Sequence, residues 1–128
     1  MKRYQFPKNF WWGSAASGPQ TEGRISGDGK GENIFDYWYK NEPQKFFDQV
    51  GPEKTSPVYT KYQEDVQLMK QTGHNSFRTS IQWSRLIPDE SGTINEEAVR
   101  FYHHYFDELI ENGIEPFVNL YHFDMPMY

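Results

Sequence analysis

Two segments with helical periodicity separate three segments of this chain that read as strands, and this alternation limits the folds open to it. One helix is predicted between Ser56-Pro57, a capping residue followed by proline at the first helical position, and Gly73. The other is predicted between the capping residue Asn95 and Gly113. Their apolar stripes comprise Val58, Tyr62, Val66 and Met69 in the first helix and Ala98, Tyr102, Phe106, Leu109 and Ile110 in the second. Because a helix separates each strand from the next, we expect right-handed parallel units.

The predicted strands lie within residues 6–18, 74–83 and 114–121. The first combines an aromatic run with small residues, and the third is mostly apolar, which is typical of strands covered on both faces. We expect Trp11, Trp12 and Trp83, in or beside these strands, to pack in the core. In the second strand the side chains alternate between an apolar and a polar face. Its two faces carry Phe77, Thr79 and Ile81 on one side and Arg78, Ser80 and Gln82 on the other. The polar face predicts an interior that binds a ligand.

The connection after the first strand is long. Residues 23–32 read as a glycine-rich loop that lacks the lysine-serine signature of a phosphate loop. Asn33 is predicted to cap a short helix from Ile34 to about Asn41, and residues 44–55 read as irregular. Three strands and two long helices are part of the pattern of a (β/α)8 barrel, which typically needs ~250 residues. We therefore expect the 128 residues to be an α/β chain with one quarter to one half of the pattern of such a barrel.

Composition excludes several classes of protein. The chain has no cysteine, so disulfides and thiolate metal sites are ruled out. Its net charge is −5 and no long basic run occurs, which argues against a nucleic-acid partner. The charged start, residues 1–7, precedes no apolar segment of a signal peptide, and nothing reaches membrane-spanning length, so we expect a cytoplasmic protein. Aromatic residues make up 18% of the chain, which suits rings that stack on sugars.

Polar residues follow the first and third strands where those strands end. His122, Phe123 and Asp124 come after the third strand, and Gln20 after the first. Side chains at the carboxyl ends of parallel strands form the ligand site of such folds. An amide and an imidazole can each donate and accept, as a sugar hydroxyl requires. From spacing alone, however, the favoured interpretation is that Gln20 is solvated and that His122 is hydrogen-bonded to the backbone.

Several motifs, in order along the chain, together resemble glycoside hydrolase family 1. The residues that carry the resemblance are Phe6-Pro7, Phe10–Ser17, Gln20–Gly23, Tyr62–Val66, Met69-Lys70, Gly73, Phe77–Arg85, Gly113–Pro116 and His122–Pro126. They cover nearly the whole chain from about Phe6 onward. Within the family, Gly18–Arg24 and Phe123 look most like the 6-phospho-β-glucosidase branch. Plain β-glucosidases more often carry tryptophan at the position of Phe123.

The resemblance implies a (β/α)8 TIM barrel that hydrolyses β-glycosides with retention and without a cofactor or metal. This chain would be the N-terminal fragment of that single domain, with its first three strands and their helices. Such a mechanism needs two carboxyls about 5–5.5 Å apart. In the family they come from an Asn-Glu-Pro motif after the fourth strand and a Glu-Asn-Gly motif at the seventh. Asn41-Glu42-Pro43 looks like the first motif but follows the first strand, so we interpret it as a coincidence. The isolated chain is therefore expected to contain no catalytic glutamate and to be inactive.

The resemblance also implies roles for six residues. Gln20 and His122 match family residues that hydrogen-bond the hydroxyls of the sugar, or sugar phosphate, bound at the −1 position. Arg78 matches an arginine that lowers the pKa of the nucleophile, and its alternative role is a structural ion pair. Glu22 and Asp124 would orient Gln20, His122 or the loops, or else be surface charges. Phe123 would support the same site.

A second hypothesis remains open at this point. The chain could be a non-catalytic module, either a truncated barrel that binds sugar or one that self-associates to cover its open strand edges.

Overall fold

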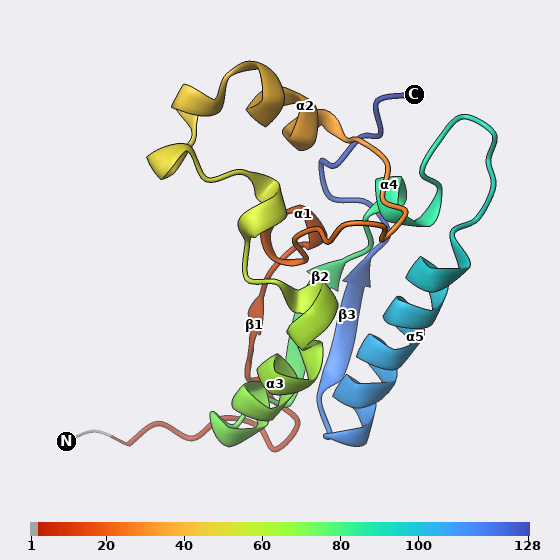
Figure 1. Cartoon of the computed structure of the whole chain (residues 1–128). Coiled ribbons are helices and arrows are strands. Elements are labelled where there is room, and N and C mark those ends of the chain that lie inside the picture. Colours follow the sequence, from red (N-terminus) through yellow and green to blue (C-terminus); the bar gives the residue numbers. More distant parts are fainter. Residues whose placement is uncertain (1–2) are drawn as a thin grey trace.

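The computed structural model describes residues 3–128 and contains one parallel sheet (Figure 1). Its strands are β1 (Gly13–Ala15), β2 (Ser76–Ser80) and β3 (Glu115–Asn119), in the order β1-β2-β3. Ser14 is the register partner of Phe77, and Arg78 that of Phe117. All three strands run in the same direction, so their carboxyl ends meet at one edge of the sheet, the upper edge in Figure 1. The predicted parallel units are confirmed. Met1 and Lys2, part of the charged start, lie outside the described residues.

The two long helices end as predicted, but the first begins differently. In α3 (Val58–Gln71) Pro57 itself occupies the N-cap, with φ −16° and ψ 54°, and its carbonyl accepts the amides of Thr60 and Lys61. The prediction that Ser56 caps this helix was therefore wrong. At its end Gly73 has φ +80°, a conformation that favours glycine. The amides of Gly73 and His74 donate to Lys70 and Met69, which closes the last turn.

Helix α5 (Glu96–Glu111) confirms the predicted cap and most of the predicted stripe. The side chain of Asn95 accepts the amides of Glu97 and Ala98. Ile110 is 58% exposed, so its assignment to the stripe was wrong. It lies about 100° around the helix from Leu109, outside the apolar face. The buried residues of the helix are Ala98, Phe101, Tyr102, Tyr105 and Leu109.

Replacing Asn95 with alanine should lower the free energy of unfolding by about 1 kcal/mol, because two amides at the start of α5 lose their acceptor. Urea denaturation measures the change. Asn95→Ser retains a capping oxygen and should recover most of the loss. An equal loss in both variants would show that the bond from Asn95 Nδ2 to the carbonyl of Asp28 (3.0 Å), rather than the cap, carries the effect.

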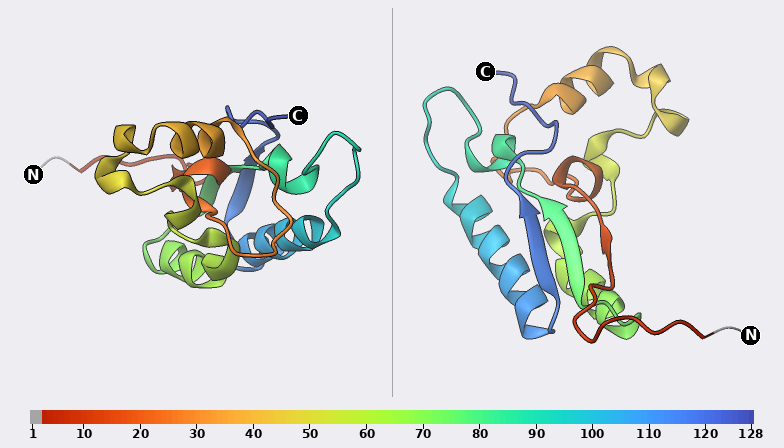
Figure 2. Two further views of the ribbon diagram at one scale, coloured as in Figure 1. Left: turned by 45° about the horizontal axis from the view of Figure 1, so that its top comes forward. Right: turned by 180° about the vertical axis from the view of Figure 1, so that it is seen from behind.

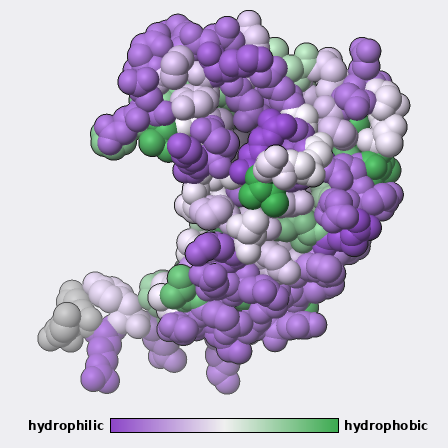
Figure 3. All heavy atoms as spheres, viewed as in Figure 1, coloured by the Kyte–Doolittle hydropathy of each residue, from purple (hydrophilic) through white to green (hydrophobic). Residues whose placement is uncertain are grey.

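The core lies between α3, α5 and one face of the sheet. Its buried side chains include Val66 from α3, Phe77 from β2, and Tyr105 and Leu109 from α5. The view from behind shows the other face of the sheet, which neither long helix covers (Figure 2). The face of the molecule that bears the outer sides of α3 and α5 is mostly hydrophilic (Figure 3), as expected for amphipathic helices.

The prediction of strands buried on both faces was wrong for β1 and β3. All of β1 is exposed, and Phe117 in β3 is 44% exposed. Among residues 3–128 both strands pair with β2 alone, and the helices cover one face only. Trp11, Trp12 and Trp83 are also exposed, against expectation. Trp12 packs on other aromatic rings at the surface, and Trp11 lies edge-on to Phe117 at 5.4 Å.

The segments that follow the strands build the upper end of the molecule in Figure 1. After β1 come α1 (Gly18–Thr21), α2 (Ile34–Asn41) and three short turns of 3₁₀ helix, η1 (Pro43–Lys45), η2 (Phe47–Gln49) and η3 (Pro52–Lys54). The prediction for α2 is confirmed, with Asn33 and Asp36 capping each other's amides. Strand β2 ends at Ser80, earlier than predicted, and the short helix α4 (Trp83–Leu86) follows. Within residues 3–128 each helix is too short or too polar to cross a bilayer.

Candidate functional site

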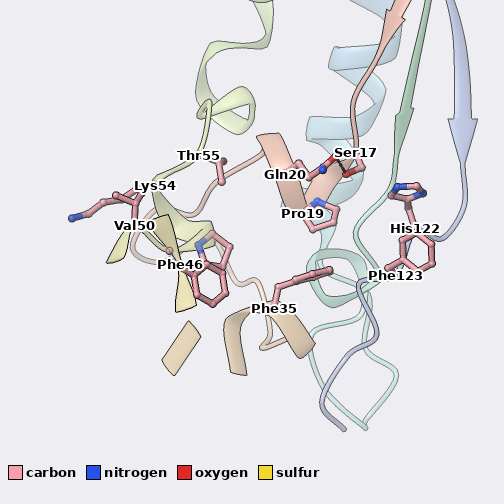
Figure 4. Close-up of a pocket in the computed structure, with 12 residues that line it drawn as sticks. Ser17, Pro19, Gln20, Phe35, Phe46, Val50, Lys54, Thr55, His122 and Phe123 are labelled. Atoms are coloured by element: carbon pink, nitrogen blue, oxygen red, sulfur yellow. Dashed lines mark hydrogen bonds between the residues drawn. The ribbon is translucent and has the colours of Figure 1, made fainter. Parts of the chain in front are cut away.

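A cavity of about 330 Å³ lies at the carboxyl ends of the strands (Figure 4). Gln20 from α1 and His122 from the segment after β3 both line it, as does Phe123. Across the cavity are Phe35 from α2 and Phe46 from the short turns. The structure thus brings together three of the six residues that the sequence pointed to. It also adds Phe35, which lies in the predicted helix, and Phe46, which lies in the irregular residues 44–55; the sequence analysis singled out neither.

Gln20 is held by a buried serine. Ser17 Oγ donates to Gln20 Oε1 at 2.7 Å, the dashed line in Figure 4, and Ser17 is 0% exposed. The backbone amide of Gln20 also donates to the carbonyl of Ser17. Because the amide oxygen is engaged by Ser17, the NH₂ group is the end that can donate to a ligand.

His122 is oriented by Arg78. A guanidinium nitrogen of Arg78 lies 3.2 Å from Nδ1 of His122. Since arginine can only donate, Nδ1 must accept, and the ring proton of the neutral imidazole lies on Nε2. The remaining nitrogens of Arg78 donate to the carbonyl of Ala16 at 3.2 Å and to Asn119 Oδ1 at 3.3 Å. Arg78 therefore joins the ends of all three strands.

The alternative role for Arg78, a structural ion pair, finds no partner among residues 3–128. Its hydrogen-bond partners among the described residues are neutral acceptors, and none of the ion pairs in that part of the chain includes it. The positive charge of this half-buried guanidinium is therefore not neutralised by a carboxylate from residues 3–128. Such a charge at the strand ends would favour an anionic group placed beside it.

Asp124 is fully buried, so its interpretation as a surface charge was wrong. Its Oδ1 accepts the backbone amide of His122 at 3.3 Å, while Oδ2 has no hydrogen-bond partner among the described residues. Between the two residues Phe123 has φ +67°, which is unusual for a residue with a side chain. Asp124 thus stabilises the backbone turn that presents His122. Burial raises the pKa of its carboxyl, against the effect of the surrounding backbone amides.

Replacing Asp124 with asparagine should make the protein more stable, relative to the wild type, as the pH rises. The pKa of Asp124 is raised above its ordinary 3.8 in the folded state, so ionisation costs more in the folded than in the unfolded protein. Below pH 3.8 the difference in unfolding free energy should be constant. It should shift in favour of Asp124→Asn as the pH passes through the raised pKa. Urea denaturation over a pH series measures this, with exposed Asp107→Asn as the matched control. A difference independent of pH would contradict the prediction.

Glu22 lies in a buried cluster beside the loop that follows α1. It is 3% exposed and bonds neither Gln20 nor His122. Its carboxylate accepts from Arg85 Nε at 2.8 Å, Gln82 Nε2 at 2.7 Å and the Tyr102 hydroxyl at 2.8 Å. Burial raises the pKa of Glu22, against the attraction of the Arg85 charge. The interpretation of Glu22 as a surface charge was therefore wrong.

Arg85, which the sequence analysis did not single out, is the centre of this buried cluster. It is 0% exposed and also donates to Asp28 Oδ2 at 2.9 Å and to the carbonyl of Gly23 at 2.7 Å. Its guanidinium lies 4.0 Å from the centroid of the Tyr59 ring. The signal that could have identified it is a charged residue in the short helix after a buried strand, with two acids, Glu22 and Asp28, in the connection after the preceding strand.

Asn41-Glu42-Pro43 does not contribute to the cavity. Glu42 follows α2 and bonds Lys45 at 2.9 Å and the indole nitrogen of Trp38 at 3.0 Å. The hydrogen bond from Lys45 lowers the pKa of Glu42, whereas a general acid needs a raised pKa. The position therefore agrees with a coincidental match. Within the described chain no group of three or more metal-binding side chains is assembled.

Comparison with known proteins agrees with the motifs. The family described as Glycosyl hydrolase family 1 matches residues 2–128. The chain is 63% identical to 6-phospho-beta-glucosidase GmuD of Bacillus subtilis (strain 168), over 98% of the chain and 27% of the relative. It is 40% identical to Beta-glucosidase A of Acetivibrio thermocellus, over 98% of the chain and 28% of the relative. The chain thus spans about a quarter of the length of these curated relatives.

Solved structures give the same result for the fold. Aphid myrosinase superposes with a TM-score of 0.89 at 37% identity, over 98% of this chain and 27% of its own. The psychrophilic beta-glucosidase BglU from Micrococcus antarcticus gives 0.88 at 39% identity, over 96% and 26%. These neighbours are TIM-barrel enzymes, so the predicted fold class is confirmed, and the three strands with their helices correspond to part of such a barrel. With the family matched over nearly every residue, this chain belongs to glycosyl hydrolase family 1.

Proposed function

We propose that this chain carries the sugar-binding wall of a retaining β-glycosidase that hydrolyses 6-phospho-β-glucosides. The observation that carries the proposal is the meeting of Gln20 and His122 at one cavity, each with its polar end oriented by a fixed partner. The 63% identity to GmuD supports the phosphorylated substrate class.

The site has the groups needed to recognise a sugar. Gln20 offers its NH₂ group and His122 offers the proton on Nε2, so each donates to a sugar hydroxyl. Phe123 adds an apolar ring to the same wall. Arg78, which holds His122, supplies the positive charge that would favour the ionised form of a nucleophilic carboxylate.

The chemistry of retention requires two carboxyls about 5–5.5 Å apart, one as nucleophile and one as acid and base. The cavity is lined by no carboxylate from the described residues. We therefore propose that both carboxyls come from sequence beyond these 128 residues and that the isolated chain does not hydrolyse glycosides.

Hydrolysis of 4-nitrophenyl β-glucoside 6-phosphate tests the proposal, with the unphosphorylated glucoside as the comparison. The protein at its natural length should cleave the phosphorylated substrate with the higher kcat/KM, and the isolated 128-residue chain should cleave neither. Turnover by the isolated chain would contradict the assignment of the carboxyls. Equal kcat/KM for both substrates would contradict the phosphate preference.

We also propose that the isolated chain self-associates. Strands β1 and β3 each have one edge without a strand partner among residues 3–128, and such edges promote pairing with another chain. Exposed apolar side chains beside β3, including Phe117, Leu120 and Tyr121, favour the same outcome. Sedimentation velocity should detect species larger than a monomer that increase with concentration. A stable monomer that unfolds cooperatively would contradict this.

Sugar binding by the isolated chain separates a binding module from an inert fragment. Weak binding of glucose 6-phosphate, followed by NMR titration, should be lost in Gln20→Ala and His122→Ala. Binding that persists in both variants would place the sugar elsewhere.

A further inference from the structure

One buried glutamine connects the two sides of the sugar cavity. Gln82, at the N-cap of α4, is 2% exposed. Its Nε2 donates to Glu22 Oε2 at 2.7 Å, and its Oε1 accepts from Asn33 Nδ2 at 3.2 Å. Its backbone amide donates to the Tyr102 hydroxyl at 2.8 Å. The side chain therefore uses both its donor and its acceptor, in two directions, within the protein interior.

The donor end of Gln82 bonds Glu22, which lies two residues after Gln20. Glu22 follows Gln20 in the same turn of helix, and its amide donates to the carbonyl of Gly18 at 2.9 Å. Gly18 also lies against Gln82, because a Cβ on Gly18 would come within 2.6 Å of Gln82 Cγ. The helical turn that bears Gln20 is thus both bonded to and packed against the Gln82 side chain.

The acceptor end of Gln82 bonds Asn33, which pairs with the segment after His122. Asn33 is 1% exposed and lies where the chain before α2 meets the segment after His122. There the amide of Ile34 donates to the carbonyl of Met125, and the amide of Met127 donates to the carbonyl of Glu32, both at 3.0 Å. The position of Asn33 therefore restrains the course of the chain just beyond His122.

We propose that Gln82 is a positioning residue for the sugar site, which sets the placement of Gln20 relative to His122 through Glu22 and Asn33. The inference rests on the proposed function of that site. Pairing of the strands fixes β1, β2 and β3, but α1 and residues 122–127 lie beyond the paired segments. Within residues 3–128 the Gln82 side chain bonds Glu22, at the end of α1, and Asn33, beside the segment after His122.

The chemistry of the position requires an amide of this length. Glutamate would place a carboxylate oxygen against Glu22, where the amide now donates. Methionine would fill the space but bond neither neighbour. Asparagine would keep both functions on a side chain one methylene shorter. All three substitutions are expected to weaken the link between α1 and the segment after His122 that runs through Gln82.

Steady-state kinetics on the protein at its natural length test the proposal with 4-nitrophenyl β-glucoside 6-phosphate. Gln82→Met and Gln82→Asn should lower kcat/KM roughly 10- to 100-fold, the effect of misplacing groups that hold a substrate. In the background of Gln20→Ala combined with His122→Ala, the further loss should be much smaller, because there is nothing left to position. Gln67→Met is the matched control, since it removes bonds to Glu108 and Asn112 on the outer side of the helices.

Two readouts separate a positioning role from a merely structural one and from failure of the proposed function. NMR signals of the Gln20 amide and the His122 imidazole should shift in Gln82→Asn and not in Gln67→Met, whatever the substrate. An unchanged pair of signals, or a loss of kcat/KM that is equally large without Gln20 and His122, would overturn the inference. If wild-type protein cleaves no β-glucoside, the proposed function fails, and the NMR comparison still decides the positioning role.

Discussion

Replacement of Arg85 by methionine is expected to cost about 3–5 kcal/mol of unfolding free energy, because it leaves a buried carboxylate without its cation. Glu22 is 3% exposed and Asp28 is 6% exposed, and both bond Arg85. Removal of the guanidinium also takes a donor from the carbonyl of Gly23 and a cation from the face of Tyr59. Urea denaturation of both proteins at neutral pH measures the loss.

Two further variants separate the buried charge from the lost packing. Arg100 pairs with Glu97 on the outside of α5, where the two side chains are 55% and 70% exposed, so Arg100→Met should cost less than about 1 kcal/mol. Adding Glu22→Gln to Arg85→Met should recover part of the loss, because the carboxylate left unpaired is then neutral. If Arg85→Met cost no more than Arg100→Met, the buried cluster would not be a source of stability.

The helices could be predicted because their signals are local. Asn33 and Asn95 each precede a helix and cap it, and Gly73 and Gly113 each end one in the conformation that glycine favours. The parallel sheet also followed from the sequence, since each strand was separated from the next by a helix. Such features need only neighbours in the chain, so one sequence is enough to find them.

Burial could not be predicted so well, because it depends on what covers each face. Trp11, Trp12 and Phe117 are large apolar residues of the kind that fill cores, yet they are 54%, 49% and 44% exposed. Ser56 and Ile110 show the same limit for helix starts and helix faces. For the strands, the contact that decides burial, or its absence from residues 3–128, involves segments that are distant in sequence.

The candidate site could be predicted only in part. The rule that ligands bind at the carboxyl ends of parallel strands pointed to the segment around His122, and the family resemblance assigned Gln20 and His122 to one site. Both residues line the cavity. The rule gives no partners for buried side chains. Glu22 bonds Arg85, which lies 63 positions further along the chain, and no local pattern could have paired them. Phe35 in α2 and Phe46 in the irregular turns also line the cavity, and no local pattern marked either as a site residue.

The combined substitution of Gln20 and His122 by alanine should lower kcat/KM for the phosphorylated β-glucoside by at least roughly 30-fold. Each side chain is proposed to donate to a sugar hydroxyl, and a hydroxyl left unpaired in a closed site costs about 1–3 kcal/mol, or about 2–6 kcal/mol for two. The comparison is made by steady-state kinetics on the protein at its natural length.

Monodeoxy analogues of the substrate decide whether the loss comes from those hydroxyls. Wild-type protein should discriminate strongly against the analogues that lack a hydroxyl bonded by Gln20 or His122. The double variant should discriminate much less, because the side chains that bond those hydroxyls are gone. The matched control is Gln44→Ala combined with His104→Ala, which removes the same two side-chain types from exposed positions away from the cavity. If the double variant loses kcat/KM equally for every analogue, the two side chains support the fold of the site and do not bind the sugar. Retention of discrimination at the wild-type level would assign sugar recognition to other residues.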